Sequence, residues 1–268
     1  MNEFLILAFF LAFFVGMFAA IMGIGGGALH VPILMLLFNL DYKIAVGTSL
    51  IIIVCSTFTS ALTYIKQKQI LFHIALCLAI PGFIVSATCS YLTQFISTFY
   101  LSIFFACFTF FIGVQMIFPR MGFVYPIHYG PVLEIEKKTS FGTKIHAKLS
   151  YLHLLLWGSV SGCANGLTGI GGGIINVPAM VMGGLPMHSA VATSSLVIFC
   201  ASTAAALVHL SLGHIAPLSI LIVYVAGAMI GALIGARTAH HVPEKKLRFC
   251  FGFVVIAISL SVLLRLFL

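Results

Sequence analysis

Charged side chains are scarce in this chain. Of its 268 residues, 7% are Asp, Glu, Lys or Arg, whereas 62% are hydrophobic. A soluble domain is about 25% charged and about 45–50% apolar. Such a sequence has too few charged residues to form the water-exposed surface of a soluble domain. This excludes a soluble globular enzyme, a disordered protein and a coiled coil. The composition predicts an all-α polytopic membrane protein whose solvent is the lipid bilayer.

Acidic side chains are especially rare, with five in the whole chain. Sodium sites and proton relays in membranes are commonly built from buried carboxylates, and here no carboxylate lies in the middle of an apolar run. The sequence therefore disfavours cation transport. Histidine is the remaining side chain that titrates near neutral pH, and His30 and His209 are best placed for proton coupling. The acidic residues are Glu3 at the terminus and, in predicted loops, Asp41, Glu134, Glu136 and Glu244.

Cysteine is present but lacks any paired motif. The seven cysteines form no Cys-x-x-Cys, and all lie in or beside apolar runs. We therefore expect small apolar packing residues rather than a disulfide framework or a zinc site, and we expect no metal and no cofactor. The N-terminus lacks Lys and Arg before its first apolar run, which favours a retained segment over a signal peptide.

Apolar runs fill most of the sequence, and a membrane-crossing helix needs about 20 residues. Two runs, 28–38 and 174–183, are too short to cross, and each follows a glycine cluster and a longer run. We expect a first membrane repeat at 1–118, a charged cytoplasmic linker at 119–150 and a second membrane repeat at 151–268. The remaining runs are roughly 4–22, 44–65, 70–93, 98–118, 151–168, 190–210, 215–236 and 247–267.

The two halves of the sequence repeat one another in order. Gly23-Ile-Gly-Gly-Gly-Ala-Leu-His-Val-Pro32 returns as Gly169-Ile-Gly-Gly-Gly-Ile-Ile-Asn-Val-Pro178. Ala45-Val-Gly-Thr-Ser49 returns as Ala190-Val-Ala-Thr-Ser194. The register changes by only one residue over this distance, which indicates an internal duplication. Further small residues keep the same order, with Gly82, Ser86 and Ser90 aligned to Gly227, Gly231 and Gly235.

The basic residues indicate how the halves are oriented. The formal net charge is +8, but Lys and Arg cluster in short loops, which is typical of membrane orientation rather than nucleic-acid binding. In each half, a glycine cluster separates a long apolar run from a short one. If this glycine-broken pair enters and leaves the membrane on the same side, the two halves are inverted. All 13 basic residues except Lys43 and Arg265 then lie inside. If the pair instead crosses once, the loop from Arg237 to Arg248 moves outside, against the positive-inside trend. This predicts two inverted-topology repeats, each with a glycine-broken, re-entrant-like first helix followed by three transmembrane helices, and both termini outside.

The glycine clusters predict a site for an anion. The half-helices should begin near Ala28 and Ile174, and a helix N-terminus carries roughly half a positive charge. Glycines let a ligand approach the backbone, so two such ends meeting near the midplane would bind an anion. Close packing through small residues is the alternative, whereas a dinucleotide-binding motif would need a preceding strand. The candidate positions are Gly25, Gly26, Gly27, Gly171, Gly172 and Gly173.

Hydroxyl and amide side chains near the clusters are the next candidates. Hydroxyls can donate to an oxyanion without adding charge, although in membrane helices they also bond to a carbonyl one turn back. His30 and Asn176 occupy matching positions, and Asn165 precedes the second cluster; each can contact a ligand or cap a broken helix end. We favour ligand contact for His30 and Asn176. The candidate hydroxyls are Thr48, Ser49, Thr193 and Ser194, with Ser195 beside them.

These motifs resemble the sulfite exporter TauE/SafE family of bacterial membrane proteins. The resemblance rests on the duplicated Gly-x-Gly-Gly-Gly-x-x-x-Val-Pro, the following Ala-Val-x-Thr-Ser and the small-residue run Gly227–Gly235, and it covers nearly the whole chain. It implies export or exchange of small sulfur-containing anions, such as sulfite or organosulfonates, across the bacterial inner membrane. The chain departs from simple symmetry at His30 against Asn176 and at Pro81 against Ala226.

These features together predict a secondary transporter that moves a small sulfur-containing oxyanion by alternating access. A passive anion channel is an alternative that the sequence cannot separate from a carrier. An intramembrane enzyme would need a nucleophile and a base, such as Ser194 with His209 or Cys163 with His153, but no nucleophile motif surrounds them, and we expect no enzyme. The expected partners are a small anionic substrate and the lipid bilayer, with a homodimer as a further candidate and no nucleic acid.

Overall fold

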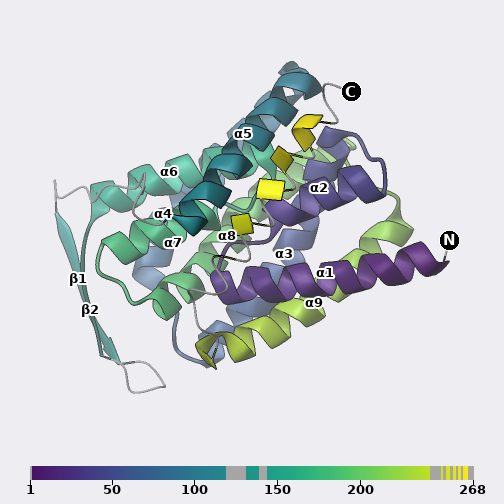
Figure 1. The fold of residues 1–268 in the computed structure, drawn as a ribbon. Coiled ribbons are helices and arrows are strands. Elements are labelled where there is room, and N and C mark those ends of the chain that lie inside the picture. The colour runs from purple at the N-terminus through teal and green to yellow at the C-terminus, as the bar shows by residue number, and fades with distance from the viewer. Residues whose placement is uncertain are drawn as a thin grey trace.

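The computed structural model describes residues 2–118, 131–138 and 144–241, and runs of one to three residues between 249 and 264. Within these ranges the chain is mainly helical, with one two-stranded ribbon (Figure 1). Residues 1–118 are here called the first half, and they contain α1 (Asn2–Met22), α2 (Gly27–Leu37), α3 (Tyr42–Lys66), α4 (Phe72–Leu92), the 3-10 turn η1 (Thr93–Phe95) and α5 (Thr98–Ile117). Residues 151–268 are the second half, with α6 (Tyr151–Thr168), α7 (Gly173–Met182), α8 (Met187–Ser211), α9 (Leu218–Thr238) and the 3-10 turn η3 (Ala239–His241).

The predicted apolar runs are helices at nearly their predicted bounds. The half-helices α2 and α7 begin one residue earlier than expected, at Gly27 and Gly173. The run at 247–267 lies mostly outside the described residues, and those described within it are helical. The positions of the apolar runs therefore located the helices well.

Several helices are long and apolar enough to cross a membrane. The described residues contain five such spans, whereas α2 and α7 are shorter apolar helices, as predicted. The chain is therefore a multi-pass membrane protein. The five candidate spans are Leu5–Met22, Tyr42–Lys66, Phe72–Phe95, Met187–Ser211 and Leu218–His241.

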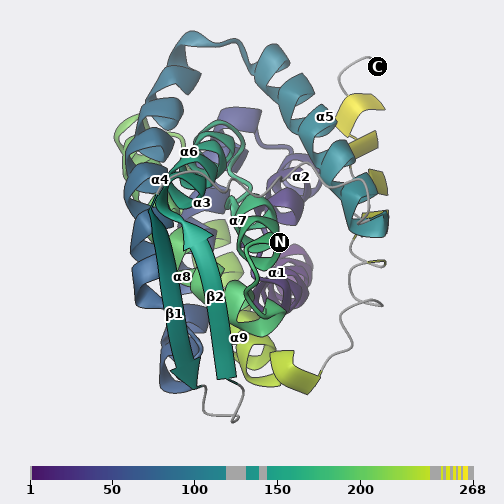
Figure 2. The same cartoon turned by 90° about the vertical axis from the view of Figure 1, so that its left-hand side faces the viewer.

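The helices of the two halves are exchanged rather than packed separately. The central pair, α3 and α8, is 67% and 61% buried, against 39% or less for the other candidate spans. Around this pair, α9 from the second half lies along α1 and α3, whereas α4 from the first half lies along α6 and α8 (Figures 1 and 2). Two helix groups result: the first group is α1, α2, α3 and α9, and the second group is α4, α6, α7 and α8.

Small residues let the exchanged helices approach closely. A Cβ on any of three α9 glycines would overlap a carbonyl oxygen of α1, and the pairs are Gly227 with Phe9, Gly231 with Phe13 and Gly235 with Met17. Three α6 glycines face α4 in the same way, and the pairs are Gly158 with Leu78, Gly162 with Gly82 and Gly166 with Ser86. The predicted small-residue run on α9 is thus a helix-packing surface.

Part of the predicted linker is a β-ribbon that the all-α prediction did not include. Strands β1 (Val132–Lys138) and β2 (Lys144–Ser150) pair antiparallel, with Leu133 opposite Leu149. Leu149 is buried beside Gly183 at the end of α7, which attaches the ribbon to the helices. Residues 119–130 and 139–143 of the linker lie outside the described residues.

Candidate functional site

The two glycine clusters fold into loops of the same backbone conformation. The φ angles of Gly23, Gly25 and Gly26 are 66°, 91° and 85°, and those of Gly169, Gly171 and Gly172 are 66°, 98° and 70°. This left-handed region is sterically costly for residues that carry a Cβ. The repeated sequence therefore forms the same broken helix twice, and glycine is required at these positions.

The two loops contact each other through their backbones. A Cβ on Gly27, the first residue of α2, would overlap the carbonyl oxygen of Gly169 and lie 2.7 Å from the Cα of Ile170. A Cβ on Gly173, the first residue of α7, would overlap the carbonyl oxygen of Gly23 and lie 2.7 Å from the Cα of Ile24. Between them, a Cβ on Gly25 would lie 3.3 Å from the Cα of Gly171. The structure thus brings the predicted glycines of both halves together, and backbone atoms fill the point of contact.

Both half-helices begin without a side-chain cap in the described part of the chain. Their N-caps are Gly26 and Gly172, and both starts are buried. The first N–H groups of a helix have no acceptor within the helix, and the helix dipole adds positive potential there. Two electropositive backbone ends therefore lie close together inside the protein.

The predicted hydroxyl side chains bond to the opposite half of the chain. Both threonines accept a backbone N–H, in the bonds Thr48 Oγ1 with Ala216 at 2.9 Å and Thr193 Oγ1 with Leu71 at 3.1 Å. Both serines donate to a glycine carbonyl, in the bonds Ser49 with Gly169 at 3.2 Å and Ser194 with Gly23 at 2.8 Å. Each hydroxyl has a protein partner here, so ligand contact by these residues stays a prediction.

Alanine at Ser49 or at Ser194 is expected to destabilise the protein to a similar, small degree. Each change removes one buried hydrogen bond between a loop carbonyl and the opposite half, which is worth about 1 kcal/mol. The melting temperature in detergent measures the effect. Ser195→Ala is the control, because this hydroxyl donates within its own helix to Val191, and a smaller shift is expected. A loss at only one of the two positions would contradict the equivalence of the loops.

Asn165, in α6 just before the second glycine loop, forms a hydrogen bond to that loop. Its amide oxygen accepts the N–H of Gly171 at 2.9 Å and the hydroxyl of Ser202 at 3.2 Å, and its amide nitrogen donates to Ser86 at 2.8 Å. Asn165 is fully buried. This predicted site residue therefore connects the second loop to α4 and α8 through three hydrogen bonds.

A small cavity lies beside Gly25 in the first loop. Its volume is about 10 Å³, close to the smallest space that holds one water molecule. Sequence analysis named Ser195 near this site but missed the other hydroxyls, although they follow Ser49 along α3 at near-helical spacing. The cavity is lined by backbone and small side chains of Gly16, Ala19, Ala20, Gly25 and Ala232 and by the hydroxyl residues Ser56, Thr57, Ser60 and Ser195.

His30 and Asn176 are buried beside the loops with unsatisfied polar atoms. Their exposed fractions are 0% and 1%, and within the described ranges neither side chain has a hydrogen-bond partner. Each residue lies one turn after its N-cap glycine, and helical side chains lean toward the N-terminus. A Cβ on Gly26 would lie 2.9 Å from Nε2 of His30. Because an unpaired buried polar group costs about 1–3 kcal/mol, these two side chains are candidates for hydrogen bonds to a ligand, and that contact stays a prediction.

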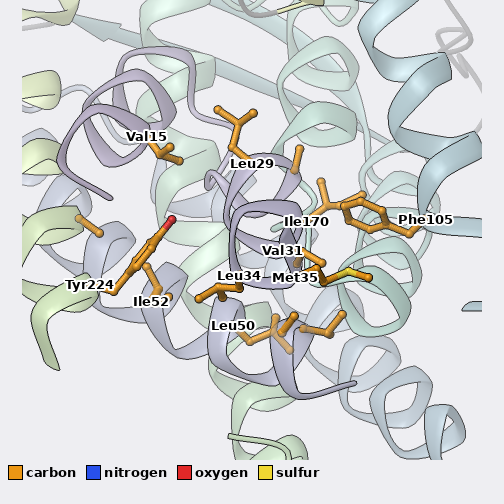
Figure 3. Close-up of a cluster of buried hydrophobic side chains, with 14 of the residues drawn as sticks. Val15, Leu29, Val31, Leu34, Met35, Leu50, Ile52, Phe105, Ile170 and Tyr224 are labelled. Carbon is orange, nitrogen blue, oxygen red and sulfur yellow. The ribbon is translucent and has the colours of Figure 1, made fainter. Parts of the chain in front are cut away.

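Tyr224 of α9 is a polar neighbour that sequence analysis missed. Its ring packs edge-on against His30, with ring centroids 5.4 Å apart. Figure 3 shows Tyr224 beside Val15 and Ile52, with its hydroxyl directed into the buried cluster. Among the described residues this hydroxyl also has no partner. No polar pattern in the surrounding α9 sequence distinguishes this tyrosine from an ordinary packing residue.

The other titratable candidates contact groups away from the loops. Nδ1 of His209 lies 3.2 Å from Nδ1 of His214, which is in the connection between α8 and α9. Burial and the positive charge of Lys43 lower the pKa of His214. His153, proposed as a base for Cys163, lies 2.9 Å through Nε2 from the carbonyl oxygen of Ala179. The residues of the two imagined enzyme sites therefore have other partners.

Known proteins resemble this chain along most of its length. The family described as Sulfite exporter TauE/SafE matches residues 8–262. The Probable membrane transporter protein YunE of Bacillus subtilis (strain 168) is 28% identical over 262 residues, which cover 91% of this chain and 92% of that protein. The Probable membrane transporter protein MJ0441 of Methanocaldococcus jannaschii is 30% identical over 190 residues, which cover 68% of this chain and 63% of that protein. No solved structure matches this chain.

Proposed function

Because the chain belongs to the sulfite exporter TauE/SafE family, we propose that it is a secondary transporter that moves small sulfur-containing oxyanions, of the sulfite or organosulfonate type, by alternating access. Its relatives are named as probable membrane transporters. The observation that carries the substrate class is the meeting of two uncapped half-helix starts beside the unpartnered side chains of His30 and Asn176. Backbone N–H groups at helix starts are typical ligands of oxyanions.

The buried polar groups favour an anion over a cation. In the described ranges, the buried polar side chains are those of Ser, Thr, His, Asn and Gln, and none is Asp or Glu. Hydroxyl, amide and N–H groups stabilise an oxyanion by donating hydrogen bonds, whereas a buried carboxylate would repel it. The site therefore has the donors that a small oxyanion needs.

The two halves have opposite orientations in the membrane in this proposal. Equivalent contacts recur with the halves exchanged, since Ser49 and Ser194 each bond to the opposite glycine loop. The excess of Lys and Arg in alternate loops supports a cytoplasmic linker at 119–150 and both termini outside. The membrane is the bacterial inner membrane.

The moving units are the two helix groups rather than the two halves of the sequence. Each group contains one glycine loop and its half-helix, and each is closed by the helix exchanged from the other half. Separation of the groups would open the contact between the loops first to one side of the membrane and then to the other. The hydrogen bonds of Ser49 and Ser194 to the opposite loop join the two groups, so they would break and form again in each cycle.

Transport in proteoliposomes tests this function. Purified protein is expected to exchange radiolabelled sulfite with saturable kinetics, and unlabelled sulfite on the opposite side should accelerate uptake by counterflow. Liposomes without protein give the background. Flux that stays linear with concentration and shows no counterflow would favour a passive anion channel, and the absence of flux for every sulfur oxyanion tested would refute the proposed substrate class.

A further inference from the structure

A side chain in the second half occupies a space whose equivalent in the first half is a cavity. Asn165 on α6 accepts hydrogen bonds from Gly171 and Ser202. In the aligned halves the equivalents of these donors are Gly25 and Thr57, and both line the cavity of the first half. The equivalent of Asn165 is Ala19, which also lines the cavity and carries no polar group. The cavity therefore occupies the place that the asparagine side chain takes in the second half.

Donors for an acceptor surround this cavity. The φ angles of Gly25 and Gly171 are 91° and 98°, and the two loops share their pattern of left-handed glycines, so we expect the N–H of Gly25 to point as its equivalent does, toward the cavity. Thr57 now donates to the carbonyl of Ile53 at 2.6 Å within α3, and Ser195 donates to Val191 at 3.1 Å within α8. Rotation about χ1 would redirect these hydroxyls to a bound acceptor.

His30 lies close to Ala19, one of the residues that line this cavity. A Cβ on Gly26 would lie 2.9 Å from Nε2 of His30 and 3.0 Å from the Cβ of Ala19, so those two atoms are less than 6 Å apart. The histidine ring is fully buried, and both of its nitrogens lack a partner among the described residues. A buried polar side chain without a described partner therefore lies near the cavity lining, independently of the comparison between the halves.

We propose that the transported oxyanion binds at the cavity beside the first glycine loop and not at the equivalent place beside the second, with one oxygen at the position that corresponds to the amide oxygen of Asn165. The N–H of Gly25 and the hydroxyl of Thr57 donate to this oxygen, and His30 donates to a second one. This inference rests on the proposed function and adds an asymmetric site to it. Asn165 then acts as a permanent internal acceptor that keeps the second loop closed.

The size of the cavity connects this site with the movement of the helix groups. A volume of about 10 Å³ accommodates one oxygen atom but not a whole sulfur oxyanion. Its walls come from both groups, because Ser195 belongs to α8 whereas Thr57 belongs to α3. Separation of the groups would enlarge the cavity, which makes the described conformation a closed one of the cycle.

Ala19→Asn tests the site by giving the first half its own internal acceptor. The introduced amide is expected to fill the cavity, satisfy the N–H of Gly25 and raise the melting temperature by about 2–4 °C. Addition of sulfite should raise the melting temperature of the parent but not that of the variant. Transport by the variant should fall below about a tenth of the parent rate. If the larger side chain prevents folding, Ala19→Ser supplies a smaller acceptor and should give a partial loss of the same kind.

A matched pair across the halves tests the asymmetry. Thr57→Val removes the hydroxyl proposed to bind the oxyanion and should raise KM for sulfite by roughly tenfold, the effect of one hydrogen bond to a charged group. Ser202→Ala removes the equivalent hydroxyl of the second half, which bonds to Asn165, and KM should stay within about twofold of the parent. Equal changes in the two variants would overturn the asymmetric site.

The outcomes separate this proposal from the transport function. A folded Ala19→Asn protein that binds and transports sulfite like the parent would overturn the site and leave the function intact. If the parent instead responds to sulfate or inorganic phosphate and not to sulfite, and Ala19→Asn abolishes that response, the site stands and the proposed substrate fails. A parent that responds to none of these anions would refute both.

Discussion

Replacing Gly27 or Gly173 by alanine is expected to leave little folded protein. Both glycines are the first residues of their half-helices, where alanine would otherwise favour the helix by about 1 kcal/mol. The added Cβ would overlap the carbonyl oxygen of Gly169 in one variant and of Gly23 in the other. Backbone atoms of a packed loop cannot move aside as a side chain can, so we expect a loss of about 3 kcal/mol or more in stability.

The yield of monodisperse protein after heating in detergent measures this loss, and size-exclusion chromatography separates folded from aggregated material. Gly82→Ala is the matched control, because it adds the same Cβ inside a buried helix, where its nearest neighbour would be the carbonyl oxygen of Gly158 at 3.3 Å. The control should melt within a few degrees of the parent. Normal stability of either loop variant would mean that the two loops do not touch in the folded protein.

Replacing Asn165 by alanine is expected to have the next largest effect, a loss of about 2–4 kcal/mol in stability. The change removes hydrogen bonds to Ser86 and Ser202 and leaves the N–H of Gly171 buried without an acceptor. The variant would also open in the second half a cavity like that of the first. Addition of a ligand that enters this new cavity would restore part of the stability.

The midpoint of thermal unfolding measures the loss, with Ser202→Ala as the control that removes a single bond to the same amide oxygen. The control should lose about 1 kcal/mol or less. If both variants melt at the same temperature, the amide of Asn165 does not hold the loop, and the comparison with Ala19 loses its basis.

The sequence predicted the helices and the glycine loops because both depend on local features. Long apolar runs are helical in a membrane because the backbone groups must form hydrogen bonds with one another. Gly23 and Gly169 adopt the left-handed conformation directly after α1 and α6, where these helices end. The ribbon was also predictable in principle. Leu133 and Ile135 alternate with charged residues in β1, and this period of two is typical of a strand.

The partners of the side chains could not be predicted from the sequence. The duplication made Thr48 and Thr193 equivalent, but it did not indicate that each accepts an N–H from the opposite half. Nor did it indicate that α4 and α9 are exchanged, because small-residue faces can pack on many helices. Asn165 was a candidate ligand, and only the contacts in space show that its amide already bonds to Gly171.

The exchange of α4 and α9 also constrains how such a molecule could have arisen. A half-length ancestor with the sequence of one unit would have had no partner for its first and fourth helices within its own chain. Two copies lying antiparallel in the membrane could have completed each other by swapping that fourth helix. In that case a gene fusion would join two intertwined subunits, and the positions of Ala19 and Asn165 would be free to differ once they were separate parts of one gene.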